Sequence, residues 1–349
     1  MKRIAAALGL LLLAGSGASA QSDESSAKEK VTPLFASDER LNITLTGPIK
    51  TIVNRAERSM DPHPARLQAA GESHAISLSA RGKSRRKGEN CKFPPLRIEF
   101  SAKPAETSLF HKQGGIKLVT HCSTREKYDQ YVLREYAMYR LYSVVTPESL
   151  KVRLAQVTYL DDGDVVAARP GFLIEDADDA ARRLGVKEVD IGNIGSNLLN
   201  REAAARFAMF QYMIGNTDWA MVVGPDPTDC CHNSKLLGES KSARRDLTPV
   251  PYDFDNSGMV DAPYAYPNAA LGTNSVRTRV YRGFCSLNSL VPGEIERLRR
   301  LRPQFEAEIR AIPGLEQRTR EDMLRYLDGY YKSVADERSV KRNIYDKCR

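Results

Sequence analysis

The amino-acid sequence predicts an α+β fold of two lobes, a strand-rich N-lobe at residues 39–175 and a helical C-lobe at residues 176–349. Three observations predict it. In the first half, short runs of alternating apolar and polar residues surround one long helical stripe. From Asp176 onward, longer runs with helical spacing dominate. The length that remains after a signal peptide, about 330 residues, fits two packed lobes with a cleft between them.

Residues 1–20 have the pattern of a secretory signal peptide. Lys2 and Arg3 precede an apolar run, and Ala18-Ser19-Ala20 is a small-residue cleavage site. The apolar run is too short to span a membrane. We therefore expect an exported mature protein, periplasmic or secreted, with no integral membrane segment after cleavage. Residues 21–38 are polar and rich in Ser, Glu and Lys, which predicts a flexible leader.

The elements of the N-lobe follow from apolar spacing. An apolar stripe of helical period predicts a helix at residues 125–142, capped by Ser123 or Thr124. The sequence Asp161-Asp162-Gly163-Asp164 is a strong hairpin signal between two strands. The predicted strands are residues 41–45, 75–78, 96–100, 116–119, 152–160 and 165–175.

The C-lobe is predicted to hold three main helices. The first covers residues 200–214 and ends at Gly215, and the others cover residues 293–301 and 316–331. Pro303 and the pair Pro313-Gly314 are predicted to break the helical runs.

The basic excess is mild and partly local. The signal peptide carries Lys2, Arg3 and no acid, so its removal lowers the net charge from +8 by two, to +6. A cluster at residues 81–87 would hold phosphate groups or an acidic partner, and a solvated loop is the alternative. It lacks the interleaved aromatic residues of a single-stranded nucleic-acid surface, so we expect no nucleic-acid partner.

Six cysteines in an exported chain predict disulfide bonds, and their spacing matches no zinc pattern. Cys91 opens the predicted strand at 96–100 and Cys122 closes the one at 116–119. If these strands are antiparallel neighbours, the two cysteines lie at the same end and can form a bridge. The adjacent Cys230 and Cys231 could join two different bridges, and the sequence leaves their connectivity open.

The segment from residue 216 to residue 258 holds the candidate chemistry. Asp218 follows the predicted helix end, Asn233 comes after a gap, and Asp253 and Asp255 lie beside a turn. Phosphoryl transfer from ATP needs such a set, because one carboxylate orients and deprotonates the acceptor while an amide and further carboxylates hold Mg²⁺. The same residue types also dominate ordinary turns, which is the alternative interpretation.

The order of several short motifs resembles the bacterial spore-coat CotH-type kinases and, more distantly, the HipA-type and secretory-pathway kinases. The resemblance implies a protein-kinase-like fold with ATP and Mg²⁺ or Mn²⁺ as cofactors. The motifs are Arg81-Gly82-Lys83-Ser84, Leu133-Arg134-Glu135-Tyr136, Gly171-Phe172-Leu173-Ile174-Glu175, Gly215-Asn216-Thr217-Asp218 and Pro251-Tyr252-Asp253-Phe254-Asp255-Asn256.

This resemblance implies a role for each acid. Asp218 matches the catalytic base that accepts the substrate proton. Asp253 matches the metal-binding aspartate, and Asp255 is a second candidate metal ligand. The metal-binding amide falls on Asn233 after an insertion, with Asn216 or Asn256 as substitutes.

The resemblance also implies a nucleotide site. Lys117, or in competition Lys92, would contact the phosphates, and Glu135 would pair with Lys117 unless it forms an ordinary structural ion pair. The loop over the phosphates would contain Gly82, Ser84 and Arg85. Glu175 would lie at the hinge where adenine docks.

We therefore expect an exported kinase that transfers phosphate from ATP to a protein or another hydroxyl-bearing substrate. One alternative is a catalytically inactive scaffold or binding protein of the same fold, stabilised by disulfides. Another is a metal-dependent hydrolase, which is disfavoured because the five histidines lack metal-ligand spacing. The phosphate loop departs from ordinary kinases in having a single glycine.

Overall fold

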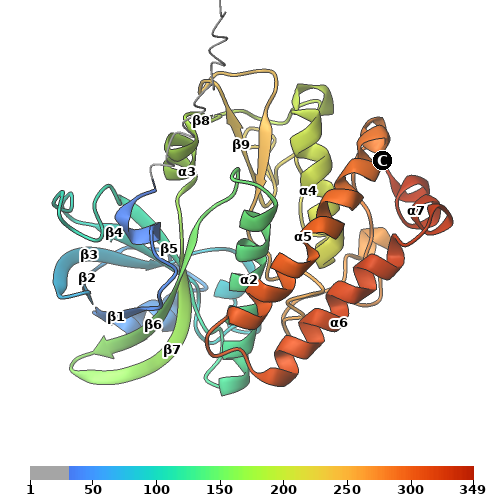
Figure 1. Cartoon of the computed structure of the whole chain (residues 1–349). Helices are drawn as coiled ribbons and strands as arrows, with labels where there is room; N and C mark the ends of the chain where they lie inside the picture. The colour runs from blue at the N-terminus through green and yellow to red at the C-terminus, as the bar shows by residue number, and fades with distance from the viewer. Residues whose placement is uncertain (1–30) are drawn as a thin grey trace, which may run out of the picture. The chain divides into compact units, whose positions relative to one another are not determined.

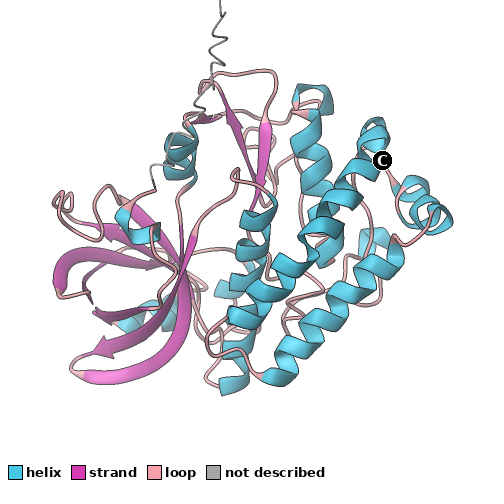
Figure 2. Cartoon of the chain, viewed as in Figure 1, coloured by secondary structure: helices cyan, strands magenta, loops and turns pink. Residues whose placement is uncertain are grey.

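The computed structural model describes residues 31–349, so the predicted signal peptide and residues 21–30 of the predicted leader lie outside the described residues. Within this range the first seven strands close into a barrel in the order β1-β2-β3-β4-β5-β7-β6 (Figures 1 and 2). Neighbouring strands are antiparallel, except that β1 pairs in parallel with β6. The strands are β1 (Leu41–Thr46), β2 (His63–Ala69), β3 (Glu72–Ala80), β4 (Leu96–Phe100), β5 (Gly115–Val119), β6 (Val152–Asp161) and β7 (Asp164–Ile174).

The expected two-lobed kinase-like fold is wrong, because the strands form a closed mixed barrel. The closing contact is the parallel ladder between β1 and β6, which runs from Leu41 opposite Ala155 to Thr46 opposite Leu160. Closure satisfies the edge hydrogen bonds that an open sheet leaves unpaired. Alternating apolar residues predicted most of these strands correctly, but they carry no information on which distant strand pairs with each edge.

The barrel interior is filled by apolar side chains that alternate along each strand. They belong to one core cluster, with Leu45, Leu78 and Ile98 fully enclosed. Leu34 and Phe35 are buried in the same cluster, so this part of the predicted flexible leader, residues 21–38, packs into the core instead. The short helix α1 (Ile49–Arg55) packs near β3 and β6.

Helices account for much of the rest of the described chain, and α2 (Asp129–Val145) is the central one. It contacts barrel strand β7 on one side and α5 (Val291–Ala311) on another (Figure 1). This double packing explains why α2 is buried around nearly its whole circumference rather than along one stripe. The remaining helices are α3 (Ala177–Leu184), α4 (Arg201–Ile214), α6 (Gln317–Ser333) and α7 (Glu337–Asn343).

Two features of the second half differ from expectation. A three-stranded sheet, ordered β10-β9-β8, was not predicted because its strands are short: β8 (Lys187–Glu188), β9 (Ser234–Gly238) and β10 (Thr248–Pro251). The break predicted at Pro303 is also wrong, since α5 continues through it. Phe305 and Ile309 are fully buried beyond the proline, so packing outweighs its local cost. The break at Pro313-Gly314 does separate α5 from α6.

All six cysteines lie in the described residues and pair into disulfides. Cys91 and Cys122 are bonded, with an S–S distance of 2.02 Å, and β4 and β5 are antiparallel neighbours, so both parts of that prediction are confirmed. Cys230 bonds to its neighbour Cys231 rather than to two different partners. The third bridge joins Cys285 to Cys348. No helix in the described range is long and apolar enough to cross a membrane.

Candidate functional site

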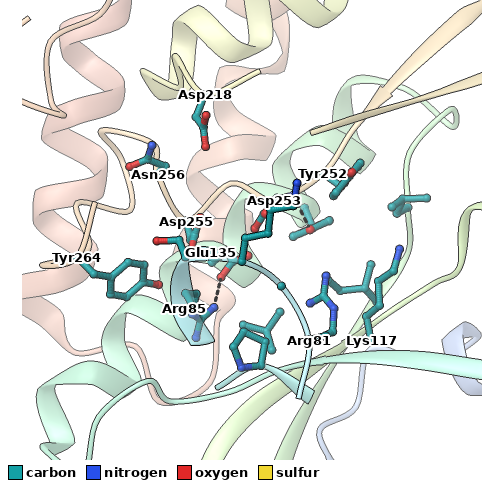
Figure 3. Close-up of a pocket in the computed structure, with 18 of the residues that line it drawn as sticks. Arg81, Arg85, Lys117, Glu135, Asp218, Tyr252, Asp253, Asp255, Asn256 and Tyr264 are labelled. Atoms are coloured by element: carbon teal, nitrogen blue, oxygen red, sulfur yellow. Dashed lines mark hydrogen bonds and ion pairs between the residues drawn. The ribbon is translucent and has the colours of Figure 1, made fainter. Parts of the chain in front are cut away.

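A cleft of about 90 Å³ collects most of the predicted site residues. One part of its wall comes from the loop after β3 and from β5, and another from α2 and the end of β7. The rest comes from the segments after α4 and β10. Arg81 and Lys117 lie side by side in the close-up, while the three aspartates come from the later segments and Glu135 from α2 (Figure 3). The predicted residues in the wall are Gly82, Ser84, Arg85, Lys117, Glu135, Asp218, Asp253 and Asp255.

Asp218 is held in position by the turn that ends α4. Gly215 adopts a left-handed conformation with φ of 69°, which terminates the helix. The Asn216 side-chain oxygen then accepts a hydrogen bond from the Asp218 N–H at 2.9 Å, and the Trp219 indole donates to the Asn216 carbonyl. Trp219 is almost fully buried, so it anchors the turn while Asp218 faces the cleft.

Asp253 and Asp255 flank a buried anchor, Phe254. Its ring lies edge-on to Tyr139 of α2, with 4.7 Å between the centroids. The Asp253 N–H donates to the Tyr139 hydroxyl at 2.9 Å, and its φ of 61° is a strained left-handed conformation for a non-glycine residue. The local packing therefore turns both carboxylates into the cleft.

The acids repel one another in the absence of a cation. Burial, together with the charge of Asp253, raises the pKa of Asp255 to about 7. Carboxylate oxygens are suitable ligands for a hard divalent cation, which would relieve this repulsion. The carboxylates of Asp253 and Asp255 are therefore suited to hold a hard divalent cation such as Mg²⁺ or Mn²⁺.

Glu135 pairs with Arg85 instead of Lys117. The Arg85 and Glu135 side chains are both buried, and Nη1 lies 3.6 Å from Oε2 (Figure 3). Arg85 also donates to the Thr120 carbonyl at 2.6 Å. Burial, aided by the charge of Asp255, raises the pKa of Glu135 despite this arginine. The pair ties the predicted phosphate loop to α2.

Lys117 is left as a partly buried cation without a counter-ion. Its Nζ lies 5.6 Å from the centre of the Tyr252 ring, and no ion pair or hydrogen bond engages it among residues 31–349. Burial, with the nearby charge of Arg81, lowers the pKa of Lys117. The Arg81 guanidinium likewise makes no ion pair within the described chain. Two such cations beside each other favour an anionic ligand between them and the acids.

Two predicted nucleotide residues do not line the cleft. Lys92 is exposed, and its Nζ donates to the Gly88 carbonyl at 2.7 Å. Glu175 is fully buried and receives two hydrogen bonds from Arg183. Ile174, the residue before Glu175, does line the cleft. Glu175 therefore has the predicted position along the chain, but its side chain does not line the cleft.

The insertion after Asp218 brings Asn233 back beside Asp218 and not into the cleft wall. Backbone hydrogen bonds join His232 to Ala220 and Val223 and close the inserted loop. The Asn233 amide then donates to the Asp218 carbonyl at 2.7 Å and to its carboxylate at 3.2 Å. Of the suggested substitutes, Asn256 lines the cleft, whereas Asn216 is buried in the turn.

His232 is a site residue that sequence reasoning missed. Its Nε2 lies 2.7 Å from the Asp218 carboxylate. This hydrogen bond raises the pKa of His232, and it lowers that of Asp218 although burial acts in the opposite direction. The available signal was its position directly before Asn233. Tyr252, Tyr264 and Tyr266 also line the cleft and carried no signal of their own.

Another group of acids lies outside the cleft. Ligand oxygens of Asp176, Asp178 and Glu188 come within 4.8 Å of one another. Asp176 already caps α3 and Glu188 pairs with Lys235 at 2.8 Å, so this group has structural roles.

Neither a protein-family model nor a curated protein sequence matches the chain.

Proposed function

We propose that the protein is a phosphotransferase that moves the terminal phosphoryl group of ATP to a hydroxyl-bearing acceptor. One observation carries the proposal: three aspartates from two separate segments meet in a cleft that also holds two unpaired cations, Lys117 and Arg81. Phosphoryl transfer depends on positioning and charge neutralisation rather than on covalent chemistry by the protein. The proposal rests on these side chains and not on the fold.

Each residue has a defined task in this proposal. Lys117 and Arg81 bind phosphate oxygens, and Asp253 with Asp255 would hold a divalent cation that neutralises phosphate charge. Asp218 accepts the proton of the acceptor hydroxyl as its oxygen attacks phosphorus. The apolar part of the wall, from Val119, Leu150 and Ile174, provides contacts for the nucleotide base.

The size of the cleft sets a condition on binding. Its volume of about 90 Å³ is well below the roughly 300 Å³ at the lower end of small-molecule pockets. We infer that nucleotide binding is accompanied by an outward movement of Gly82 and Lys83, the exposed residues of this part of the wall. Gly82 has a φ of 85°, and Arg85 anchors the following residues through Glu135, so the movement is confined to the start of this loop.

A binding protein without catalysis is the second candidate, and one observation favours it. The Asn233 amide donates to Asp218 instead of offering its oxygen in the cleft wall. In this alternative the cleft binds nucleotide without transfer.

We also infer that the protein is exported. The three disulfides are typical of proteins that fold in an oxidising compartment, and the sequence pattern of residues 1–20 agrees. Nucleotide for the reaction must then be supplied outside the cytoplasm.

The test compares Asp253→Ala with Asp218→Asn. Thermal shift is measured with ATP, with and without Mg²⁺ or Mn²⁺, and turnover is measured as ADP formation from radiolabelled ATP. We expect Asp253→Ala to abolish the metal-dependent shift. Asp218→Asn should retain the shift while turnover falls roughly 100-fold or more, the scale of a lost general base.

Asp226→Asn is the matched control, because Asp226 is exposed on the same inserted loop and outside the cleft. It should leave both readouts unchanged. Wild type that binds nucleotide without turnover would support the binding protein. Absence of any metal-dependent nucleotide effect in the wild type would reject both candidates.

A further inference from the structure

Asp218 borders two more cavities besides the cleft. One, of about 250 Å³, is also lined by Val223, His232 and Arg282. The other, of about 300 Å³, is also lined by Tyr266 and Ala270. Both cavities share Thr217, Asp218 and Asn268 and extend from there to different residues. We call the two together the side groove.

The side groove contains an arginine, Arg282, that forms no ion pair within the described chain, although the charge of Asp218 acts on it. Arg282 Nη1 donates to the carbonyls of Thr217 and Trp219, at 2.5 and 2.6 Å, and its buried Nε has no hydrogen-bond partner. A second guanidinium, that of Arg349, lies 5.6 Å from the centre of the Trp219 ring, where Arg282 lies at 5.0 Å. Neither arginine forms an ion pair with a carboxylate of the described chain.

This arrangement contrasts with the arginines of the helices. Arg134, Arg140 and Arg302, for example, each contact acidic side chains. At the groove, burial and the charge of Arg349 lower the pKa of Arg282 to about 10. Arg282 and Arg349 place two positive charges beside one tryptophan ring and form no ion pair, and a carboxylate is the planar partner that a guanidinium prefers.

The other surfaces of the side groove suit an extended chain. Val223 and Tyr266 are 44% and 60% exposed, which is high for large apolar side chains. They line different cavities, and Asp218 lines both. An extended ligand that contacts both side chains therefore occupies cavities that the Asp218 carboxylate also borders.

We propose that the side groove binds the phosphoryl acceptor, and that this acceptor is a polypeptide segment whose Ser or Thr is flanked by acidic side chains. The inference rests on the proposed phosphotransferase function. The acceptor hydroxyl lies against Asp218 and an acidic side chain lies against Arg282. The hydroxyl oxygen bonds to the terminal phosphorus, the bond from phosphorus to the leaving diphosphate oxygen breaks, and Asp218 takes the hydroxyl proton.

The test changes charge in the groove without touching the residues that hold Asp218. Val223→Glu and Val223→Lys place opposite charges of similar size at an exposed position in the cavity of Arg282. Val165→Glu and Val165→Lys are the matched controls, since Val165 is 63% exposed on the β6–β7 hairpin. Fluorescence anisotropy measures binding of three serine peptides, acidic, neutral and basic, at low and at physiological salt.

We expect the wild type to bind the acidic peptide best. Val223→Glu should weaken that binding by roughly fivefold or more and Val223→Lys should retain or strengthen it, with a smaller contrast at higher salt. The Val165 variants should match the wild type. In transfer assays, Val223→Glu should raise KM for the acidic peptide and leave KM for ATP unchanged.

Equal binding of acidic and basic peptides, or no peptide binding, would overturn the inference. So would equal effects of Val223→Glu and Val223→Lys. The metal-dependent ATP thermal shift, measured on the same variants, reports separately on the proposed function. A retained ATP shift with no charge preference rejects only the groove. A charge preference without an ATP shift rejects the phosphotransferase and, with it, the role of the bound peptide as phosphoryl acceptor.

Discussion

Arg85→Met is the substitution that tests the electrostatic organisation of the cleft most directly. The guanidinium is buried 3.6 Å from Glu135, and Asp253 and Asp255 add further negative charge around it. Removing one member of a buried pair typically costs about 3–5 kcal/mol, because the remaining charge is left without compensation. We expect a loss of this size in the free energy of unfolding at pH 8.

The expected change in melting temperature follows from the size of the protein. At about 2.1 cal/mol/K per residue, the roughly 320 described residues give an unfolding entropy of about 0.7 kcal/mol/K. A loss of about 3–5 kcal/mol then lowers Tm by about 4–7 °C. Calorimetry at pH 8 and pH 5 measures it, with Lys83→Met as a control at an exposed position of the same loop.

The loss should be smaller at pH 5. Burial raises the pKa of Glu135 already in the wild type, and removal of Arg85 raises it further. Because the folded variant then holds a proton that the unfolded chain releases above its ordinary pKa, stability of the variant rises as pH falls. Arg85→Met with Glu135→Leu should recover most of the loss. A cost below about 1 kcal/mol at both pH values, as for a surface pair, would refute the reasoning.

Three further predictions concern the site and its supports. His232→Ala should lower kcat with little change in KM for ATP, because His232 orients Asp218. His232→Gln should restore part of kcat. A loss of ATP affinity in His232→Ala would contradict this orienting role. The increase in Tm caused by Mg²⁺ should grow as pH rises from about 4 to about 7. The reason is that the raised pKa of Asp255 makes the metal-free protein lose stability over that window. A Mg²⁺ effect on Tm that is independent of pH would be inconsistent with a metal at Asp255. Replacing both Cys91 and Cys122 by Ala should lower the unfolding free energy by about 3.7 kcal/mol, measured by urea denaturation. An unchanged unfolding midpoint would show that this bridge, across a separation of 31 residues, does not stabilise the protein.

Local features of the chain were predictable because they depend on near neighbours in sequence. The helix end at Gly215 and the turn at Asp162-Gly163 follow from backbone preferences that act within a few residues. The Cys91–Cys122 bridge was accessible too, since it required only that two consecutive strands pair.

The sequence by itself thus determined most strands of the barrel, the main helices and which acids belong to one candidate site. Tertiary structure decided that β1 pairs with β6, that Arg85 and not Lys117 meets Glu135, and that His232 reaches Asp218. The physical reason is the separation along the chain over which each interaction acts. Periodicity records which face of an element is buried, whereas strand closure and charge pairing depend on distances between segments that only the folded chain brings together.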